Sequence, residues 1–222
     1  MLSVLCSSDA SVRDTFANIL SLEKIDDTPI AIVYRREKWI FTFLKTPLTE
    51  DHVHWIASSF LPDRLYFPYL GYSIDAIHEV GDVIVPNVFF SYKRSLADTI
   101  VTEANRDTLI ENPRFLESLT EQKDYYVEDF GLSIGGILID EAPNTANDEL
   151  MTKMMFAYEG DVYTSASLGV SLDVLEKEII PTAIIAGIVH GKAHPKNSQL
   201  NPLEFTARNM VTTIRLMEDK EE

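Results

Sequence analysis

The feature that most constrains the fold is an unbroken apolar run near the carboxyl end of the chain, Pro181–Val189. Isoleucine, valine and threonine supply most of it, and these β-branched residues favour strands. No charged residue interrupts the run, so both faces of the strand are expected to be buried, as in sheets that helices cover on both sides. The run therefore predicts an α/β domain.

Strand and helix patterns alternate along the rest of the chain, without an internal repeat. The 222 residues suffice for one such domain, with a mixed, mostly parallel sheet flanked by helices and a frayed acidic tail at 218–222. The predicted strands are Ile30–Tyr34 and Trp39–Leu44 (a hairpin), Leu65–Ile74, Val80–Pro86, Asn87–Tyr92, Ser133–Ile139 and Val162–Thr164. The predicted helices are Asp9–Leu22, one opened by Thr49, Asn112–Leu119, one capped by Ser165 or Ser167, and one capped by Asn201.

Composition and charge exclude several classes of protein. A formal net charge of −16 argues against a general nucleic-acid binder and against anionic membrane surfaces. No run approaches the roughly 18 apolar residues of a membrane span, and residues 1–6 lack the basic flank of a signal peptide. Cys6 is the one cysteine, which excludes a disulfide framework and a cysteine zinc site. A cytoplasmic protein without a metal or cofactor is expected.

Several charged residues are interpreted as surface groups. His52 and His54 lie two positions apart on a predicted helix, so they point in different directions and cannot share a metal ion. Arg35, Arg36 and Lys38 are interpreted as solvated charges of the hairpin turn.

The predicted strand Leu65–Ile74 leads into a loop that ends at Gly81-Asp82. Loops at the carboxyl ends of strands are where α/β sheets usually bind ligands. A phosphate-binding loop would have glycines there, whereas this chain has Tyr69, Gly71 and Tyr72. These three residues are candidates for contact with a substrate.

Taken in order, the segments resemble those of the nucleoside phosphorylase and nucleosidase superfamily, over roughly residues 30–217. Val80–Pro86 is similar to the family's "VGDVVIP" turn and strand, and Gly136–Ile139 resembles the strand before its Ser-Gly-Asp segment. Asp161–Tyr163 leads into a helix as the family's "DMES" segment does, and Ile180–Ile185 resembles "VPFVVVR". The resemblance implies a nucleoside or purine base as ligand, phosphate as a co-substrate in the phosphorylases, and a homo-oligomer.

The positions that carry chemistry in the family differ here. Tyr69–Ser73 replaces the "GSAGG" loop, and Thr164–Ser167 replaces the Met-Glu that holds the ribose hydroxyls, leaving Ser165 and Ser167 as weaker candidates. The family's "RAISD" strand end is matched by Ala186–His190, so His190 stands where the family's acid protonates the leaving base. An imidazole can act as a general acid near neutral pH.

Three further residues at predicted strand ends are candidates. Lys192 and His194 belong to a cationic cluster after His190, which would suit an anion. Asp140 follows another central strand and could contact a sugar or base.

Two interpretations of function stay open. One is a divergent phosphorylase or nucleosidase that cleaves an N-glycosidic bond with His190 as its acid. The other is a non-catalytic relative, a binding or structural subunit beside an active paralogue, with an acidic surface for a protein partner. Fold-level analogy alone does not decide between them.

Overall fold

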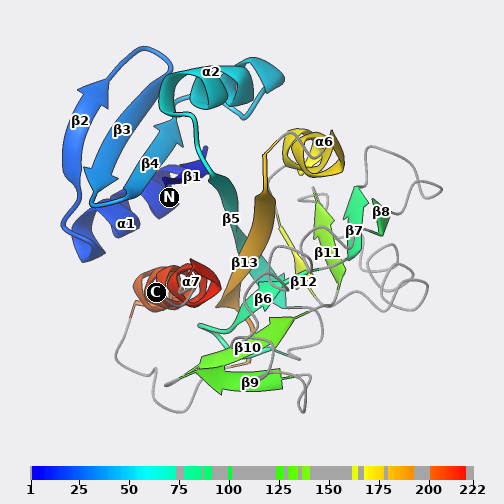
Figure 1. Ribbon diagram of the computed structural model, residues 1–222. Helices are drawn as coiled ribbons and strands as arrows, with labels where there is room; N and C mark the ends of the chain where they lie inside the picture. Colours follow the sequence, from blue (N-terminus) through cyan, green and yellow to red (C-terminus); the bar gives the residue numbers. More distant parts are fainter. Residues whose placement is uncertain are drawn as a thin grey trace.

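A computed structural model describes residues 2–73, 78–86, 88–91, 100–101, 124–127, 130–134, 137–140, 162–164, 168–177, 180–192 and 201–218. Within these residues the chain forms one mixed sheet of 13 strands with helices on both faces (Figure 1). The predicted α/β class and mixed sheet are confirmed. The strands are β1 (Ser3–Ser7), β2 (Glu23–Asp27), β3 (Ala31–Arg36), β4 (Trp39–Leu44), β5 (Arg64–Ser73), β6 (Val83–Val85), β7 (Val88–Ser91), β8 (Ile100–Val101), β9 (Asp124–Val127), β10 (Phe130–Ile134), β11 (Ile137–Asp140), β12 (Val162–Tyr163) and β13 (Thr182–His190).

Strand β5 is the centre of the sheet. Along one edge it pairs in parallel with β13, from Leu65 opposite Thr182 to Tyr72 opposite His190. Along the other edge its first residues pair in parallel with β1, and its last two pair antiparallel with β12. The sheet therefore branches at β5: β1 continues to β4, β3 and β2, β12 continues to β11, β7 and β8, and β13 continues to β6, β10 and β9.

Helices α1 (Ala10–Ile19) and α7 (Pro202–Glu218) pack on one face of this sheet, and α2 (Glu50–Phe60) and α6 (Gly169–Lys177) lie on the other (Figure 1). Strand β13 is buried along Thr182–Ile188 because both layers cover it, as its apolar run predicts. No helix in the described part of the chain is long and apolar enough to span a membrane.

The helix starts follow the capping residues of the sequence. Asn201 accepts a hydrogen bond from the Leu203 N–H at 3.1 Å, which fixes the start of α7. Thr49 caps α2, and the His52 ring in turn bonds the Thr49 N–H at 3.1 Å. His52 therefore replaces the Glu or Gln of an ordinary capping box, while His54 is exposed.

Two sequence predictions need correction. The single predicted strand Ser133–Ile139 is two strands, since β10 pairs with β6 and β9 whereas β11 pairs with β7 and β12. The amino-terminal segment holds two strands beside its helix: β1 is fully buried, and β2 is fully exposed at an edge of the sheet. The predicted helix Asn112–Leu119 and residues 219–222 of the tail lie outside the described residues.

Candidate functional site

The carboxyl ends of β5 and β13 lie side by side, because the two strands are parallel. Their register shifts once, between Ile188 and His190, and this irregularity sets His190 opposite Tyr72. Their last residues bring Tyr72 and His190 together, with ring centroids 6.2 Å apart and planes inclined at 47°. His190 is exposed and Tyr72 is partly buried. An imidazole and an aromatic face thus stand next to each other at the end of a parallel strand pair, where α/β sheets usually bind ligands.

The turn at Gly81-Asp82 fixes this end of the sheet. Gly81 has a φ of 100°, which glycine adopts without strain, and a Cβ there would collide with the ring of Phe205 on α7. Its N–H donates to the Ile188 carbonyl, and its own carbonyl accepts from the Asn209 amide at 2.7 Å. The turn therefore ties β13 and α7 together just before His190.

Asp82 extends the same clamp to another strand. Its carboxylate accepts the Glu79 N–H and the Gly131 N–H, each at 2.8 Å, and its carbonyl accepts the Ile188 N–H. Burial raises the pKa of the Asp82 carboxyl, and the two backbone N–H groups oppose that rise. The absence of a side chain at Gly131 lets the Asp82 carboxylate approach its N–H closely. A Cβ at this position would lie only 3.0 Å from Asp82 Oδ1.

The segment 78–80 pairs with the residues that follow β13. The Lys192 ammonium lies 3.7 Å from the Glu79 carboxylate. The Val80 N–H donates to the Lys192 carbonyl, and the Lys192 N–H donates to the His78 carbonyl, each at 2.9 Å. The Lys192 side chain is 65% exposed, so the ion pair is screened by solvent. A carboxylate this close also opposes the binding of a second anion at Lys192.

His78 and Ser73 belong to this end of the sheet, although neither is a site residue that the sequence predicts. The His78 N–H donates to Ser73 Oγ at 2.9 Å, so His78 is held against the last residue of β5. His78 Nε2 is buried and has no hydrogen-bond partner within the described residues. A histidine in a loop is usually exposed, so only the fold reveals this one.

Tyr69 and Gly71 lie on β5 but point into the packed interior. The Tyr69 hydroxyl is 2.8 Å from Ser171 Oγ on α6, and the tyrosine is buried. A Cβ on Gly71 would lie 2.6 Å from a methyl group of Val162. The glycine thus allows β5 and β12 to pack closely.

The remaining candidates are less well placed. Asp140 is the last residue of β11, and of its side chain nothing is described. Ser165, Ser167 and His194 lie outside the described residues. Among the residues that are described, no three His, Cys, Asp or Glu side chains gather as a metal ion would require.

Comparison with known proteins finds a similar fold without a similar sequence. No family model matches this sequence, and no curated protein matches it. Solved structures do match over nearly their whole length. A futalosine hydrolase mutant of Helicobacter pylori is 11% identical with a TM-score of 0.67, covering 99% of both chains. The Helicobacter pylori 5′-methylthioadenosine/S-adenosylhomocysteine nucleosidase with butyl-thio-DADMe-Immucillin-A is 9% identical with a TM-score of 0.67, covering 97% of this chain and 98% of that one.

A plant enzyme extends the likeness beyond bacteria. The apo 5′-methylthioadenosine nucleosidase of Arabidopsis thaliana is 11% identical with a TM-score of 0.64, covering 99% of this chain and 96% of that one. At such identities the likeness concerns the fold rather than the chemistry. This chain has the fold of the methylthioadenosine/S-adenosylhomocysteine nucleosidases, as the order of its motifs predicts.

Proposed function

We propose that this chain is a divergent nucleosidase that binds a purine nucleoside at the carboxyl ends of β5 and β13 and hydrolyses its N-glycosidic bond. The observation that carries the proposal is the Tyr72–His190 pair, with ring centroids 6.2 Å apart. The fold supports the nucleoside as ligand, because the similar solved structures include a nucleosidase with a bound Immucillin.

The two side chains have complementary roles in this proposal. Tyr72 offers an aromatic face, against which a nucleobase can stack. His190, which is exposed, donates a proton to the leaving base as the bond between C1′ and the base nitrogen breaks. Water then forms the new C–O bond at C1′ and releases a proton, so the products are the free base and the free sugar.

The surroundings of Lys192 favour water over phosphate as the nucleophile. The Glu79 carboxylate is 3.7 Å from the Lys192 ammonium and, although solvent screens the pair, it lowers the attraction of this site for an anion. Base release should therefore not depend on added phosphate. A phosphorolytic reaction would require other cations to hold the phosphate, with His194 as the remaining sequence candidate.

The test is base release from a panel of purine nucleosides, with and without phosphate, followed by chromatography. His190→Ala should lower the rate by roughly 10²–10⁴-fold, the usual contribution of a general acid. His54→Ala is the matched control, because His54 is an exposed histidine on α2. A variant rate equal to that of the parent would exclude His190 as the acid.

A second function, binding without catalysis, is favoured by one observation. A Cβ on Gly71 would lie 2.6 Å from a methyl group of Val162. This glycine therefore allows two strands to pack closely, instead of letting the backbone approach a ligand. Equilibrium dialysis with a purine nucleoside separates the two functions. Binding that Tyr72→Ala weakens, without any base release, would identify a non-catalytic relative, whereas neither binding nor release would contradict both.

A further inference from the structure

A second concave site lies at the opposite end of the sheet from Tyr72 and His190. Its cavity measures about 300 Å³ and is formed between the amino-terminal part of β4, β1, the end of α1 and the last turns of α7. Strands β1, β4 and β5 are parallel, and Leu5 is level with Tyr66. Tyr66 precedes Tyr72 by six residues, so the two sites are roughly 20 Å apart along the strand.

The floor of this pocket is apolar and buried. Leu5, Phe41 and Ile214 are buried there, at most 4% exposed. Trp39 adds a partly buried ring, with centroids 6.2 Å from Phe41 and 5.9 Å from Tyr66. Ligand pockets have this composition: mostly apolar and aromatic walls with a few polar groups that fix orientation.

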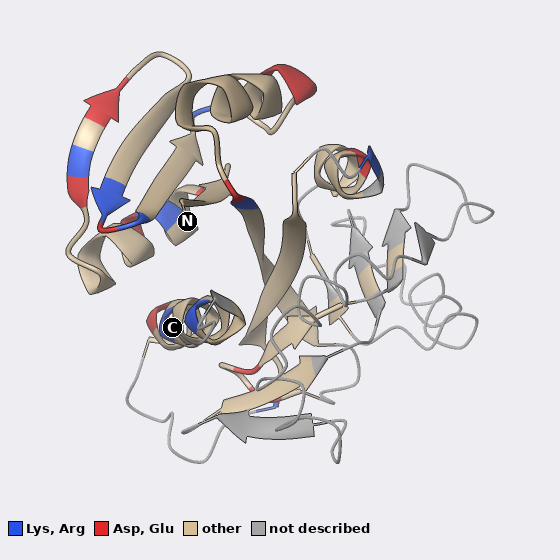
Figure 2. Ribbon diagram, viewed as in Figure 1, with Lys and Arg blue, Asp and Glu red and all other residues tan. Residues whose placement is uncertain are grey.

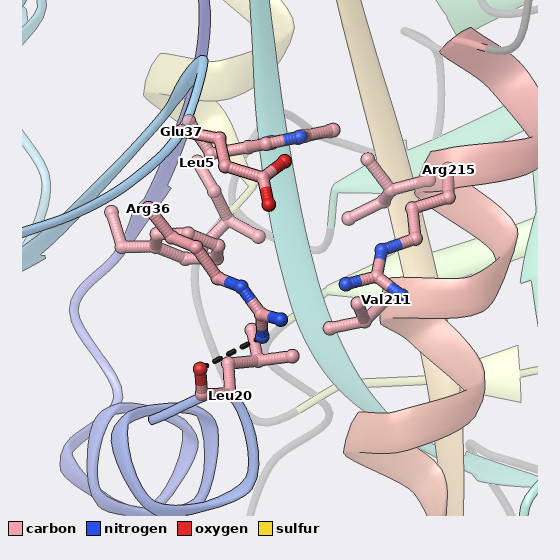
Figure 3. A pocket seen from close by; sticks show the side chains of 9 residues that line it. Leu5, Leu20, Arg36, Glu37, Val211 and Arg215 are labelled. Carbon is pink, nitrogen blue, oxygen red and sulfur yellow. Dashed lines mark hydrogen bonds between the residues drawn. The ribbon is translucent and has the colours of Figure 1, made fainter. Parts of the chain in front are cut away.

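The mouth of the pocket is charged. Arg36 and Arg215 reach into it from opposite walls, and the Glu37 carboxylate enters from a third direction (Figure 3). The net charge of the three side chains is positive, in a chain whose formal net charge is −16. Basic positions occur at the β3–β4 turn and on α7 in Figure 2. The mouth is therefore a locally basic region of an acidic protein.

The two arginines differ in their hydrogen bonding. Arg36 Nη1 donates to the Leu20 carbonyl at 2.8 Å, which holds the guanidinium in place and leaves its other N–H groups available. Arg215 has no hydrogen-bond or ion-pair partner within the described part of the chain. A planar guanidinium recognises a carboxylate better than a point charge does.

The backbone around the mouth is unusual. Of the three non-glycine residues with positive φ in the described chain, Ser21 at 49° follows the lining residue Leu20, and Glu37 at 54° lines the pocket itself. Glu37 lies in a two-residue hairpin turn, where glycine or asparagine is favoured. Such outliers gather at functional sites, where a side chain is retained despite the strain.

We propose that this pocket binds a small aromatic carboxylate. The carboxylate lies between Arg36 and Arg215, and the ring packs on Trp39 and Phe41. The volume, at the low end for ligand pockets, suits one aromatic ring with a short polar arm. Glu37 is placed to accept a hydrogen bond from an ammonium group, so an aromatic amino acid would fit better than its desamino acid.

The fluorescence of Trp39 can report ligand binding to this pocket. The chain has two tryptophans, and Trp55→Phe leaves Trp39 as the one fluorophore of its kind. In that background the probes are phenylalanine, 3-phenylpropionate and the neutral 3-phenylpropan-1-ol, with fluorescence and calorimetry as readouts. Both carboxylates should bind and perturb Trp39, and the alcohol should bind at least tenfold more weakly, since a hydrogen-bonded charge is lost.

Matched variants on one helix test the assignment. Arg215→Gln should weaken carboxylate binding roughly 10- to 100-fold. Arg208→Gln should leave it unchanged, because Arg208 lies two turns earlier on α7 and pairs with Glu204 at 2.6 Å. Tighter binding of phenylalanine than of phenylpropionate, lost in Glu37→Gln, would assign the ammonium to Glu37.

Other results would overturn the proposal. Equal binding of the alcohol and the carboxylates would mean that the arginines do not recognise the ligand. An equal loss in the Arg208 and Arg215 variants would exclude a specific role for Arg215, and absence of binding at millimolar concentrations would exclude the site. None of these readouts depends on base release at His190.

Discussion

Two tight turns lie at opposite ends of the parallel strands, and each contains a residue with positive φ. They differ in the type of residue that adopts this conformation. At the carboxyl end the turn has Gly81 with φ 100°, whereas at the amino end the β3–β4 turn has Glu37 with φ 54°. Glycine adopts such angles without strain, and a glutamate does not. The first turn thus has the residue that its backbone favours, and the second has a carboxylate instead.

The contacts of the two turns explain the difference. Gly81 and Asp82 bond to β13, β10 and α7 through both backbone and side chain, so their residues serve the fold. The Glu37 carboxylate points into the pocket of Figure 3 and bonds to no described residue. The Gly81-Asp82 turn therefore serves the fold, whereas Glu37 strains the backbone without a bond to a described residue, which is the observation behind the proposed second pocket.

Among the variants that test this comparison, Gly81→Ala should have the largest effect on the free energy of unfolding. A methyl group there strains the backbone and meets the Phe205 ring, so we expect a loss of about 2–4 kcal/mol in the free energy of unfolding. Urea denaturation measures it. Combined with Phe205→Ala, the losses should be less than additive, because the second change removes the collision. A loss below about 0.5 kcal/mol would show that the turn is not a clamp.

Asp82→Asn should have the next largest effect. An amide offers one acceptor where the carboxylate serves two N–H groups, so we expect a loss of about 1–2 kcal/mol at neutral pH.

The same variant should also change the pH dependence of stability. Burial raises the pKa of Asp82 in the folded state, so the native protein holds this proton more tightly than the unfolded chain does. The stabilisation that this proton gives the folded state is complete below the pKa of an unfolded aspartate, near 3.9. It is lost as the pH rises through the pKa of Asp82 in the folded state. The difference in stability between parent and variant should thus narrow from about pH 4 upward. A difference that widens with pH would contradict the raised pKa.

Local signals predicted the elements whose formation is itself local. Thr49 and Asn201 cap their helices as expected, and the apolar run of β13 is buried on both faces. Strand β2 was missed because Glu23–Asp27 is polar and fully exposed, so only pairing with β3 makes it a strand. The division between β10 and β11 was missed because each strand finds partners far away in the sequence.

The candidate site was predictable only in part. The resemblance of Ala186–His190 to a family strand end makes His190 a candidate acid, which stays a prediction, and the structure sets Tyr72 beside it. The second pocket gave no sequence signal. The sequence predicts a solvated turn charge at Arg36, and Arg215 lies 179 positions later in the chain. Only the packing of α7 against the first strands brings the two arginines to one cavity.

Tyr72→Ala should separate binding from stability. Tyr72 is partly buried at the end of β5, so its loss should lower the free energy of unfolding by only about 1 kcal/mol. Nucleoside binding should weaken about tenfold through the lost stacking surface, measured by equilibrium dialysis. Tyr69→Ala, a buried tyrosine of the same strand that bonds to Ser171, should instead destabilise the fold more strongly. The reverse order of stability losses would place Tyr72 in the core.

Glu37→Gly should have the smallest effect, and the opposite sign. Glycine relieves the left-handed strain at φ 54°, although it also gives the unfolded chain more freedom, so we expect a gain of at most about 1 kcal/mol. Thermal and urea denaturation measure the gain, with Glu37→Gln as the control that removes the charge and keeps the strain. The same glycine variant should lose the preference for phenylalanine over phenylpropionate at the second pocket. A turn that gains stability while it loses recognition would show that Glu37 is retained for the ligand; a loss of stability would mean that its side chain supports the fold after all.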